Sequence, residues 1–250
     1  MDDNNASRVT YPPLDSLKPV ADGVWIVDSG PLRAMGLLPI PVRMTVIKLT
    51  GGEMWLHSPT RYVHSLAEDI AGIGRIGHLV APNIAHWSFI GDWQEQCPQA
   101  ESWAAPGLRS RRQVRKSDVV FNADLDSKAP PAWQADIGQL IIPGGFGVNE
   151  VAFFHKTTRT LILTDLVENF ERRKLSPLMR PLIAAAGAMG PDGKAPLHYR
   201  LAVNLNRKEA AAAARRLLDW QPERVIFAHG QWFERDGSAR LRHSLRWLLD

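Results

Sequence analysis

The sequence predicts a layered α/β fold, with β-sheets on the inside and helices on the outside. Three observations indicate it: a hairpin pattern early in the chain, strand-like and helix-like segments that alternate after it, and 45% hydrophobic residues among 250. A chain of this size can bury a large core without disulfides or structural metals. We expect a single domain over 21–250, preceded by a flexible, polar arm over 1–20.

The first strands are expected over 22–30, 42–50 and 53–59, where aliphatic and β-branched residues are dense. Gly51 and Gly52 separate the last two of these segments. Because paired glycines accept the positive φ of a tight turn, the last two strands are predicted to form a hairpin.

A helix is predicted over 61–74, because its apolar residues recur at helical spacing and it ends at Gly74, where a C-cap favours glycine. A strand over 78–82, a short helix over 87–98 and a short strand within 100–107 follow. The next thirty residues or so are rich in proline, so no long regular element is expected there.

The second half of the chain repeats the alternation. Strands are expected within 138–145, 149–166 and 224–230. His155 should lie exposed on a hairpin turn inside the second of these segments. Helices are expected over 209–220, which is rich in alanine, and over 240–250.

The cysteine count and the hydropathy limit the environment. Cys97 is the only cysteine, so no intrachain disulfide can form and any metal must be held by His and carboxylate side chains. The polar first twenty residues resemble neither a secretory signal nor a transit peptide. No apolar run is long enough to cross a bilayer. We therefore expect a cytoplasmic protein with no membrane partner.

The net charge is +4 and the calculated pI is 9.4, values that are compatible with nucleic-acid binding. However, the basic runs at 109–116 and 171–174 are interleaved with acids or lack regular aromatic spacing, as solvated faces do. We therefore expect a small-molecule substrate and no nucleic-acid partner, and an anionic substrate remains possible. The sequence does not indicate the oligomeric state.

Three apolar segments end in side chains that can bind a metal. One is followed by Asn83 and His86, one by Asp165 and one by His229. Buried strands deliver such residues to the edge of a sheet, so these three ends are predicted to form one site from distant parts of the chain.

Each of these residues also has a structural interpretation. Asp165 can cap the turn after its strand, His229 can be a buried histidine bonded to a carbonyl, and His86 can pack as a half-polar core residue. Taken singly, the structural interpretation is favoured in each case. The coincidence of three strand ends favours a shared site.

The order of the motifs resembles the metallo-β-lactamase superfamily over residues 22–230. The motifs that carry the resemblance are EMWLHSPT, LVAPNIAHW, IIPGGFGVNEVAFF, TRTLILTDL and PERVIFAHG. The resemblance implies an αββα four-layer sandwich with one or two metals at an edge between two sheets. The Pro-Asn-x-x-His and His-Ser-Pro signatures resemble most closely an uncharacterised branch of the superfamily, a domain of unknown function.

The departures from the superfamily pattern concern its first metal position. Pro82, Ile84 and Phe146 stand where the superfamily has the three histidines of that position. At the second position, His86 stands in place of an aspartate and Trp87 in place of a histidine. Asp165 and His229 are unchanged there.

The resemblance therefore implies one divalent metal held by His86, Asp165 and His229, with open positions for water or substrate. Zinc is the first candidate, with iron or manganese as alternatives, and a zinc-bound water would make the protein a hydrolase of an unknown small molecule. Whether Trp87 blocks an open coordination position is not indicated.

Further residues are candidates for catalytic roles beside Asp165. His57 stands where the superfamily has an aspartate, and it could be a fourth ligand, an orienting residue or a proton carrier. Asn83 could donate a hydrogen bond to an oxyanion. Glu150 could be an acid, a base or an additional ligand. The segment 168–200 could be a lid over the site.

Two other functions remain open. Two histidines and a carboxylate are also the ligand set of non-haem iron oxygenases. Alternatively, the chain is a metal-free binding protein or pseudoenzyme that keeps the scaffold after losing several ligands.

Overall fold

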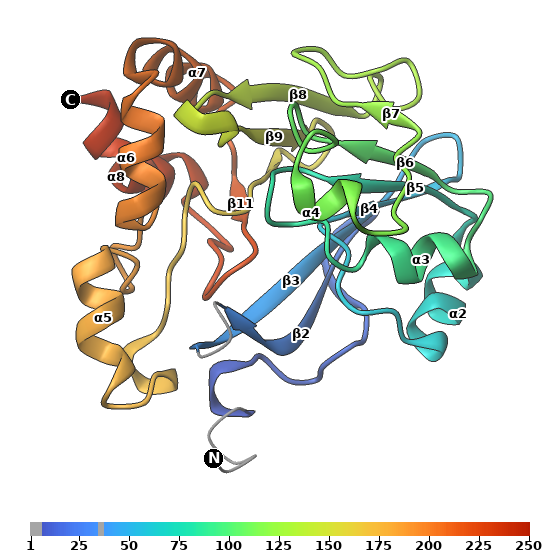
Figure 1. Ribbon diagram of the computed structural model, residues 1–250, viewed down its shortest axis with the longest axis horizontal. Coiled ribbons are helices and arrows are strands. Elements are labelled where there is room, and N and C mark those ends of the chain that lie inside the picture. Colours follow the sequence, from blue (N-terminus) through green and yellow to red (C-terminus); the bar gives the residue numbers. More distant parts are fainter. Residues whose placement is uncertain (1–6, 35–37) are drawn as a thin grey trace.

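The computed structural model describes residues 7–34 and 38–250, which form two β-sheets packed face to face. Helices cover the outer face of each sheet (Figure 1). The predicted α/β fold class is confirmed, and the layers are helix, sheet, sheet and helix.

The larger sheet has seven strands, which lie side by side in sequence order. They are β1 (Lys18–Ala21), β2 (Val24–Ala34), β3 (Leu38–Lys48), β4 (Met54–His57), β5 (Ile76–Ala81), β6 (Glu101–Ala104) and β7 (Ala123–Asp124). Strands β1 to β4 pair antiparallel, and β4 to β7 pair parallel. The predicted hairpin is β3–β4, and Gly52 in its turn has a φ of +85°.

The smaller sheet has four strands in the order β11 (Arg224–Ile226), β10 (Thr160–Ile162), β9 (Glu150–His155) and β8 (Ile137–Ile142). Strands β8, β9 and β10 pair antiparallel, whereas β10 and β11 are parallel. Because β10 and β11 run in the same direction, the segments that follow them leave the sheet at the same edge.

Two groups of helices pack on the sheets. Helices α2 (His64–Ile73) and α3 (Ile90–Gln96) lie on the larger sheet, and α7 (Arg207–Asp219) and α8 (Gly237–Leu249) lie on the smaller one. The remaining helices are η1 (Ser7–Val9), α4 (Arg112–Arg115), η2 (Gly145–Gly147), η3 (Arg172–Lys174), α5 (Met179–Ala186) and α6 (Leu197–Asn204). Within the described ranges, no helix has the length and apolar character needed to cross a membrane.

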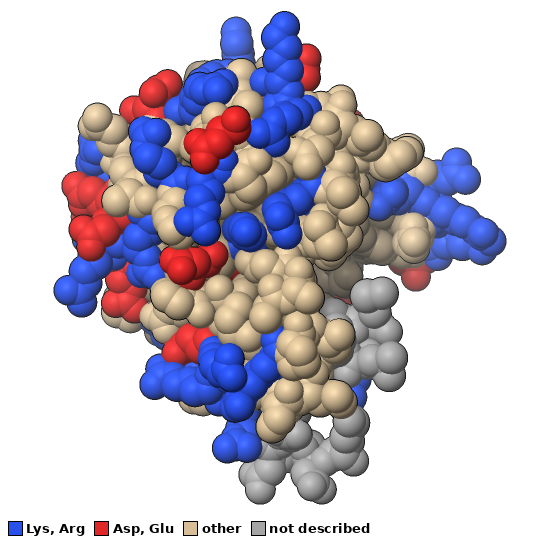
Figure 2. Space-filling view, turned by 90° about the vertical axis from the view of Figure 1, so that its left-hand side faces the viewer, with Lys and Arg blue, Asp and Glu red and all other residues tan. Residues whose placement is uncertain are grey.

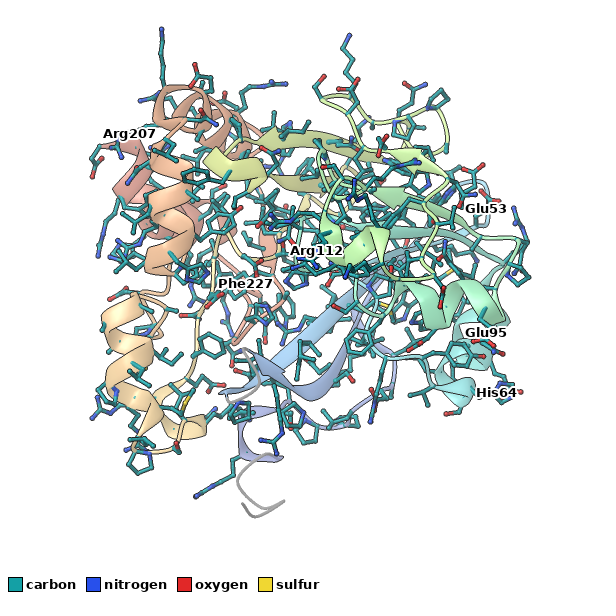
Figure 3. All side chains as sticks on the ribbon, in the orientation of Figure 1. Glu53, His64, Glu95, Arg112, Arg207 and Phe227 are labelled. Carbon is teal, nitrogen blue, oxygen red and sulfur yellow. The ribbon has the colours of Figure 1, made fainter. Side chains whose placement is uncertain are left out.

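Central strands of both sheets carry apolar side chains on their two faces, because each face is covered. In β4, Leu56 packs with the helices of the larger sheet and Trp55 packs between the sheets. In β9, Phe153 lies between the sheets and Phe154 packs toward the helices of the smaller sheet. This period of two explains why these segments read as continuous apolar runs. Figure 3 shows the packed interior, with Phe227 inside and Arg207 at the periphery.

Two expectations differ from the structure. The arm predicted over 1–20 is packed in part, since Val9 and Thr10 are buried and β1 pairs with β2; its first six residues lie outside the described ranges. His155 was expected to be exposed, and this prediction is wrong. It is the last residue of β9, is 5% exposed and lies 2.8 Å from the Thr158 hydroxyl through its Nδ1.

Gly74 is the C-cap residue of α2, as expected, but glycine is needed there for a reason other than a left-handed φ. Its φ is 179°, which is extended backbone that any residue adopts. A Cβ at this position would collide with the carbonyl oxygen of Gly52 in the β3–β4 hairpin. Glycine is therefore needed here for the close approach of two backbones.

We expect Gly74→Ala to lower the free energy of unfolding by about 1–3 kcal/mol, because the hairpin must move away from the helix end. The matched control is Gly72→Ala inside α2, where a Cβ meets nothing within 4 Å. That change should be neutral or stabilising by up to about 1 kcal/mol. Urea unfolding of both variants measures the difference. Equal stabilities would contradict the proposed contact.

Candidate metal centre

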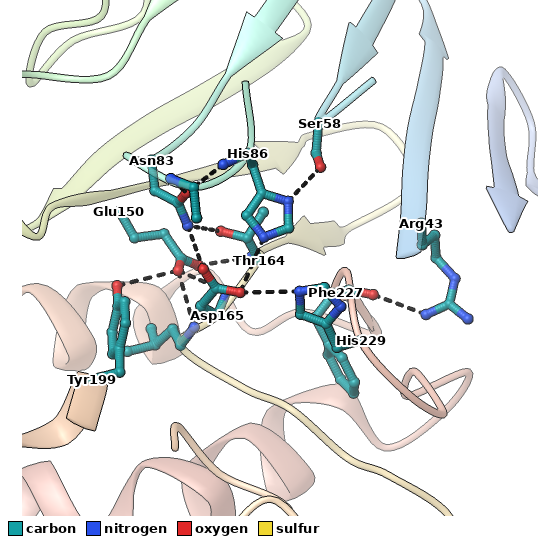
Figure 4. A network of polar contacts seen from close by, with 12 residues as sticks. Arg43, Ser58, Asn83, His86, Glu150, Thr164, Asp165, Tyr199, Phe227 and His229 are labelled. Carbon is teal, nitrogen blue, oxygen red and sulfur yellow. Dashed lines mark hydrogen bonds and ion pairs between the residues drawn. The ribbon is translucent and has the colours of Figure 1, made fainter. Parts of the chain in front are cut away.

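His86, Asp165 and His229 meet at one end of the molecule, between the two sheets (Figure 4). Asp165 and His229 each lie three residues beyond the paired strand ends Ile162 and Ile226. Since β10 and β11 are parallel neighbours, the two residues emerge side by side. His86 comes from the larger sheet, in the segment that follows β5.

The three side chains share one small space. Oδ1 of Asp165 lies 3.1 Å from Nε2 of His86 and 3.3 Å from Nε2 of His229. One ligand atom from each residue lies within 4.8 Å of the others. The convergence that the sequence predicts is therefore present in the described part of the chain.

The far nitrogen of each imidazole is held by a separate partner. Nδ1 of His229 lies 2.8 Å from the carbonyl oxygen of Pro41. A carbonyl only accepts, so Nδ1 carries the hydrogen and donates it. In the neutral ring, this leaves the Nε2 lone pair facing Asp165. Nδ1 of His86 lies 2.7 Å from Oγ of Ser58, which follows β4 with a φ of +53°.

This arrangement fits a divalent metal ion. Zinc ligands at about 2.0–2.1 Å in a tetrahedron lie about 3.3 Å apart, and the two N···O distances at Asp165 match that spacing. Metal-binding histidines usually donate their other N–H to a carbonyl, hydroxyl or carboxylate, as His229 does to Pro41. His86, Asp165 and His229 are thus able to hold such an ion.

Asn83 fixes the position of Asp165. Its Nδ2 donates to Oδ2 of Asp165 at 2.7 Å and to Oγ1 of Thr164 at 3.0 Å, while its Oδ1 accepts the backbone N–H groups of Ala85 and His86. Both amide hydrogens are used in these bonds. Asn83 therefore holds the turn of Asp165 and the His86 segment together, which differs from the expected role as an oxyanion donor.

Glu150 holds the same turn from below and is fully buried. Its carboxylate accepts the backbone N–H groups of Thr164, Asp165 and Leu166 at 2.7–3.0 Å and the hydroxyl of Tyr199 at 3.2 Å. Burial, followed by the charge of Asp165, raises the pKa of the Glu150 carboxyl, and the backbone donors offset part of this effect. With both oxygens bonded in this way, Glu150 is a positioning residue for Asp165, in contrast to the expected acid, base or ligand.

The site is built to keep Asp165 ionised. Burial opposes ionisation, but the charges and hydrogen bonds of His86 and His229 hold the pKa of Asp165 well below its ordinary value. Burial alone would lower the pKa of His229, yet the hydrogen bond and charge of Asp165 raise it to about 9. A carboxylate that attracts a proton onto a neighbouring imidazole offers the same attraction to a metal cation.

His57 lies beside this cluster and is not one of its members. It is 1% exposed, stacks on Trp55 and packs edge-on against Phe153. Burial, with a smaller contribution from the charge of His86, lowers the pKa of His57 to about 3. A histidine that is neutral and enclosed at pH 7 is poorly suited to carry protons, although its unpartnered Nε2 is compatible with an orienting role.

A cavity of about 370 Å³ opens onto the three candidate ligands. Apolar side chains form most of its wall, among them Leu32, Ile40 and Val42 from β2 and β3. Its polar lining includes Glu168 and His198, and no Lys or Arg takes part within the described ranges. Burial, followed by the nearby carboxylates, raises the pKa of Glu168 to about 8, whereas His229 lowers it.

A larger hollow of about 880 Å³ lies elsewhere on the surface and contains none of the three candidate ligands. Trp87 lines both this hollow and the smaller cavity. The three candidate metal ligands thus belong to the smaller cavity.

Sequence reasoning missed several residues of this site. The sequence did carry a signal for Ser58, because this residue belongs to the His-Ser-Pro signature. Glu168 and His198 fall at the two ends of the segment predicted as a lid, 168–200, and both line the cavity. Tyr199 carried no signal, since its partner Glu150 is forty-nine residues away in the chain.

The comparisons with known proteins agree with the fold described above. The chain is similar in structure to a metallo-β-lactamase from Pontibacter korlensis, at 14% identity and a TM-score of 0.64, over 94% of this chain and 99% of that one. It is also similar to FIM-1 from Pseudomonas aeruginosa in its mono-zinc form, at 15% identity and a TM-score of 0.61, over 93% of this chain and 94% of that one. It is similar as well to a metallo-β-lactamase from Hirschia baltica, at 14% identity and a TM-score of 0.62, over 93% of this chain and 97% of that one.

The protein thus has the metallo-β-lactamase fold, an αββα sandwich, and it carries a candidate metal site formed by His86, Asp165 and His229. Residues 21–180 match the model of the family described as "Domain of unknown function (DUF4336)". The chain belongs to this family. A search of curated proteins found no match.

We expect Glu150→Gln to lower the free energy of unfolding by about 3 kcal/mol, because an amide NH₂ would face backbone N–H donors in a buried site. Tyr199→Phe removes only one of the four donors and should cost about 1 kcal/mol. Chemical denaturation at pH 7 measures both changes. If Glu150→Gln were no more destabilising than Tyr199→Phe, the carboxylate would not be the support of the Asp165 turn.

Proposed function

We propose that the protein is a metal-dependent hydrolase with a single divalent ion, held by His86, Asp165 and His229. The observation that carries the proposal is the placement of Asp165 Oδ1 between two Nε2 atoms whose rings are oriented from behind. The mono-zinc form of FIM-1, a solved protein of the same fold, supports a single-metal site. Zinc is the ion that we expect.

A divalent ion at this position supplies Lewis acidity and a water molecule of lowered pKa. The protein's own residues supply the rest. Pro41 and Ser58 orient the two imidazoles, and Asn83 and Glu150 fix the carboxylate of Asp165. Glu168 stands in the cavity wall as a carboxyl group whose raised pKa lets it exchange a proton near neutral pH.

The cavity favours a neutral substrate with an apolar part. Apart from the metal ion itself, a carboxylate or phosphate buried there would meet the carboxyl groups of Asp165 and Glu168 and no Lys or Arg within the described lining. Burying a charge without a partner is costly, whereas the walls of Leu32, Ile40 and Val42 favour hydrocarbon. The anionic substrate that the sequence left open is thereby disfavoured.

Purification without added metal, followed by elemental analysis, tests the proposal directly. We expect close to one zinc ion per chain, and His229→Ala should reduce this content to background because one of the three ligands is lost. The matched control is His64→Ala on α2, an exposed histidine at the periphery whose loss should leave the zinc content unchanged (Figure 3). Circular dichroism checks that both variants are folded.

The outcomes separate the three functions that the sequence left open. Iron in place of zinc would support the oxygenase, and an absence of metal even after incubation with zinc would support a metal-free binding protein. Unchanged zinc content in His229→Ala would contradict the ligand set itself.

A pair of esters tests the substrate class. We expect kcat/KM of the metal-loaded protein to be about tenfold or more higher for p-nitrophenyl butyrate than for the anionic p-nitrophenyl hydrogen succinate, because no Lys or Arg in the described cavity lining can pair with the succinate carboxylate. Leu32 lies at the partly exposed rim of the cavity, and Leu32→Arg should narrow the ratio of the two kcat/KM values because its guanidinium can pair with the succinate carboxylate. A preference for the succinate ester in the unmodified protein would refute the neutral-substrate assignment.

A further inference from the structure

Two neighbouring helices carry rows of leucines that face solvent. Leu178 and Leu182 at α5 are 76% and 56% exposed, and Leu197, Leu201 and Leu205 at α6 are 48%, 61% and 59% exposed. Within each helix the leucines are four residues apart, so they share one face. Single exposed leucines are ordinary, but two adjacent rows are not. We call these five residues the leucine face.

The leucine face is extended by an exposed aromatic side chain. Helices α5 and α6 contact each other, and α6 also contacts η2. Gly145 of η2 packs directly against Leu205, and its neighbour Phe146 is 85% exposed. Both helices have only eight residues, and their opposite faces are occupied, with Ile183 and Tyr199 buried. They therefore lie flat on the protein and present one apolar face each.

The segment that carries this face is basic. The segment 171–208 contains eight lysines and arginines but only two acidic residues: Arg172, Arg173, Lys174, Arg180, Lys194, Arg200, Arg207 and Lys208 against Glu171 and Asp192. Figure 2 views this side of the molecule, where blue side chains lie beside tan surface, with red side chains between some of them. The partner of the leucine face must therefore accept hydrocarbon and positive charge together.

We propose that the leucine face docks on the surface of an anionic lipid bilayer. Short helices with an apolar face and basic flanks lie in the plane of the bilayer interface, with leucines among the upper acyl chains and Arg and Lys beside anionic headgroups. A second copy of the chain, related by a two-fold axis, would bring the same basic rim against itself. A nucleic acid would satisfy the charges and leave the leucines without a partner.

This proposal revises the expectation that the protein has no membrane partner. That expectation rested on the lack of a long apolar run, which speaks against a spanning segment and is silent on surface contact. The membrane-docking proposal is independent of the metal centre, since none of the five leucines lines the cavity.

Co-sedimentation of the full chain with lipid vesicles tests the proposal. We expect binding to phosphatidylcholine vesicles with roughly 30% phosphatidylglycerol, much weaker binding to pure phosphatidylcholine, and loss of binding in about 0.5 M salt. The double variant Leu201→Ser, Leu205→Ser should bind the anionic vesicles at least about tenfold more weakly. Both positions are exposed, and thermal unfolding checks that the variant is folded.

The control is Val120→Ser, which removes an exposed apolar side chain, 73% exposed, outside the leucine face. It should bind as the unmodified protein does. No binding to anionic vesicles, or equal binding of the double variant, would overturn the proposal. So would a dimer, seen by light scattering without lipid, that the double variant fails to form, because a second copy would then cover the face.

Discussion

The buried carboxylate of Glu150 is the interaction on which the site depends. Three consecutive backbone N–H groups, of Thr164, Asp165 and Leu166, are left free where β10 ends, and Glu150 accepts all three. A buried charge is tolerable only when hydrogen bonds replace the water that it has lost. The same bonds force the chain to turn, and the turn points Asp165 at the two histidines. Loss of this support would affect stability and site geometry together.

Most of the fold and the convergence of His86, Asp165 and His229 could be predicted because both follow from local rules. Strands covered on both faces are buried throughout and mostly apolar, as in β4, β5 and β9, and this pattern is visible in sequence. The pairing of Ile162 with Ile226 sets Asp165 and His229 at the same step past neighbouring parallel strands. Residues the same number of positions beyond two paired parallel strands lie side by side, so the strand pairing alone predicts that they are close.

The roles of the supporting residues could not be predicted, because they depend on partners distant in the chain. Glu150 and Asn83 looked like catalytic groups, yet their hydrogen bonds reach Tyr199 and Thr164, forty-nine and eighty-one residues away. Gly74 is the helix cap that the sequence predicts, yet glycine is required there by the backbone of a preceding hairpin, which the sequence does not show. Side-chain chemistry alone did not distinguish a catalytic group from a residue that positions another residue, since both use the same hydrogen-bonding atoms.

Helix α6 connects the candidate active site with the leucine face. Its buried side places Tyr199 against Glu150, its first turn places His198 in the cavity wall, and its outer side carries Leu197, Leu201 and Leu205. A bilayer that holds α6 flat would therefore steady the helix that bears on the Asp165 turn. It would also hold the apolar cavity close to a phase in which neutral apolar molecules concentrate. The two proposals thus converge on the same substrate chemistry from separate observations, the cavity lining on one side of α6 and the exposed leucines on the other.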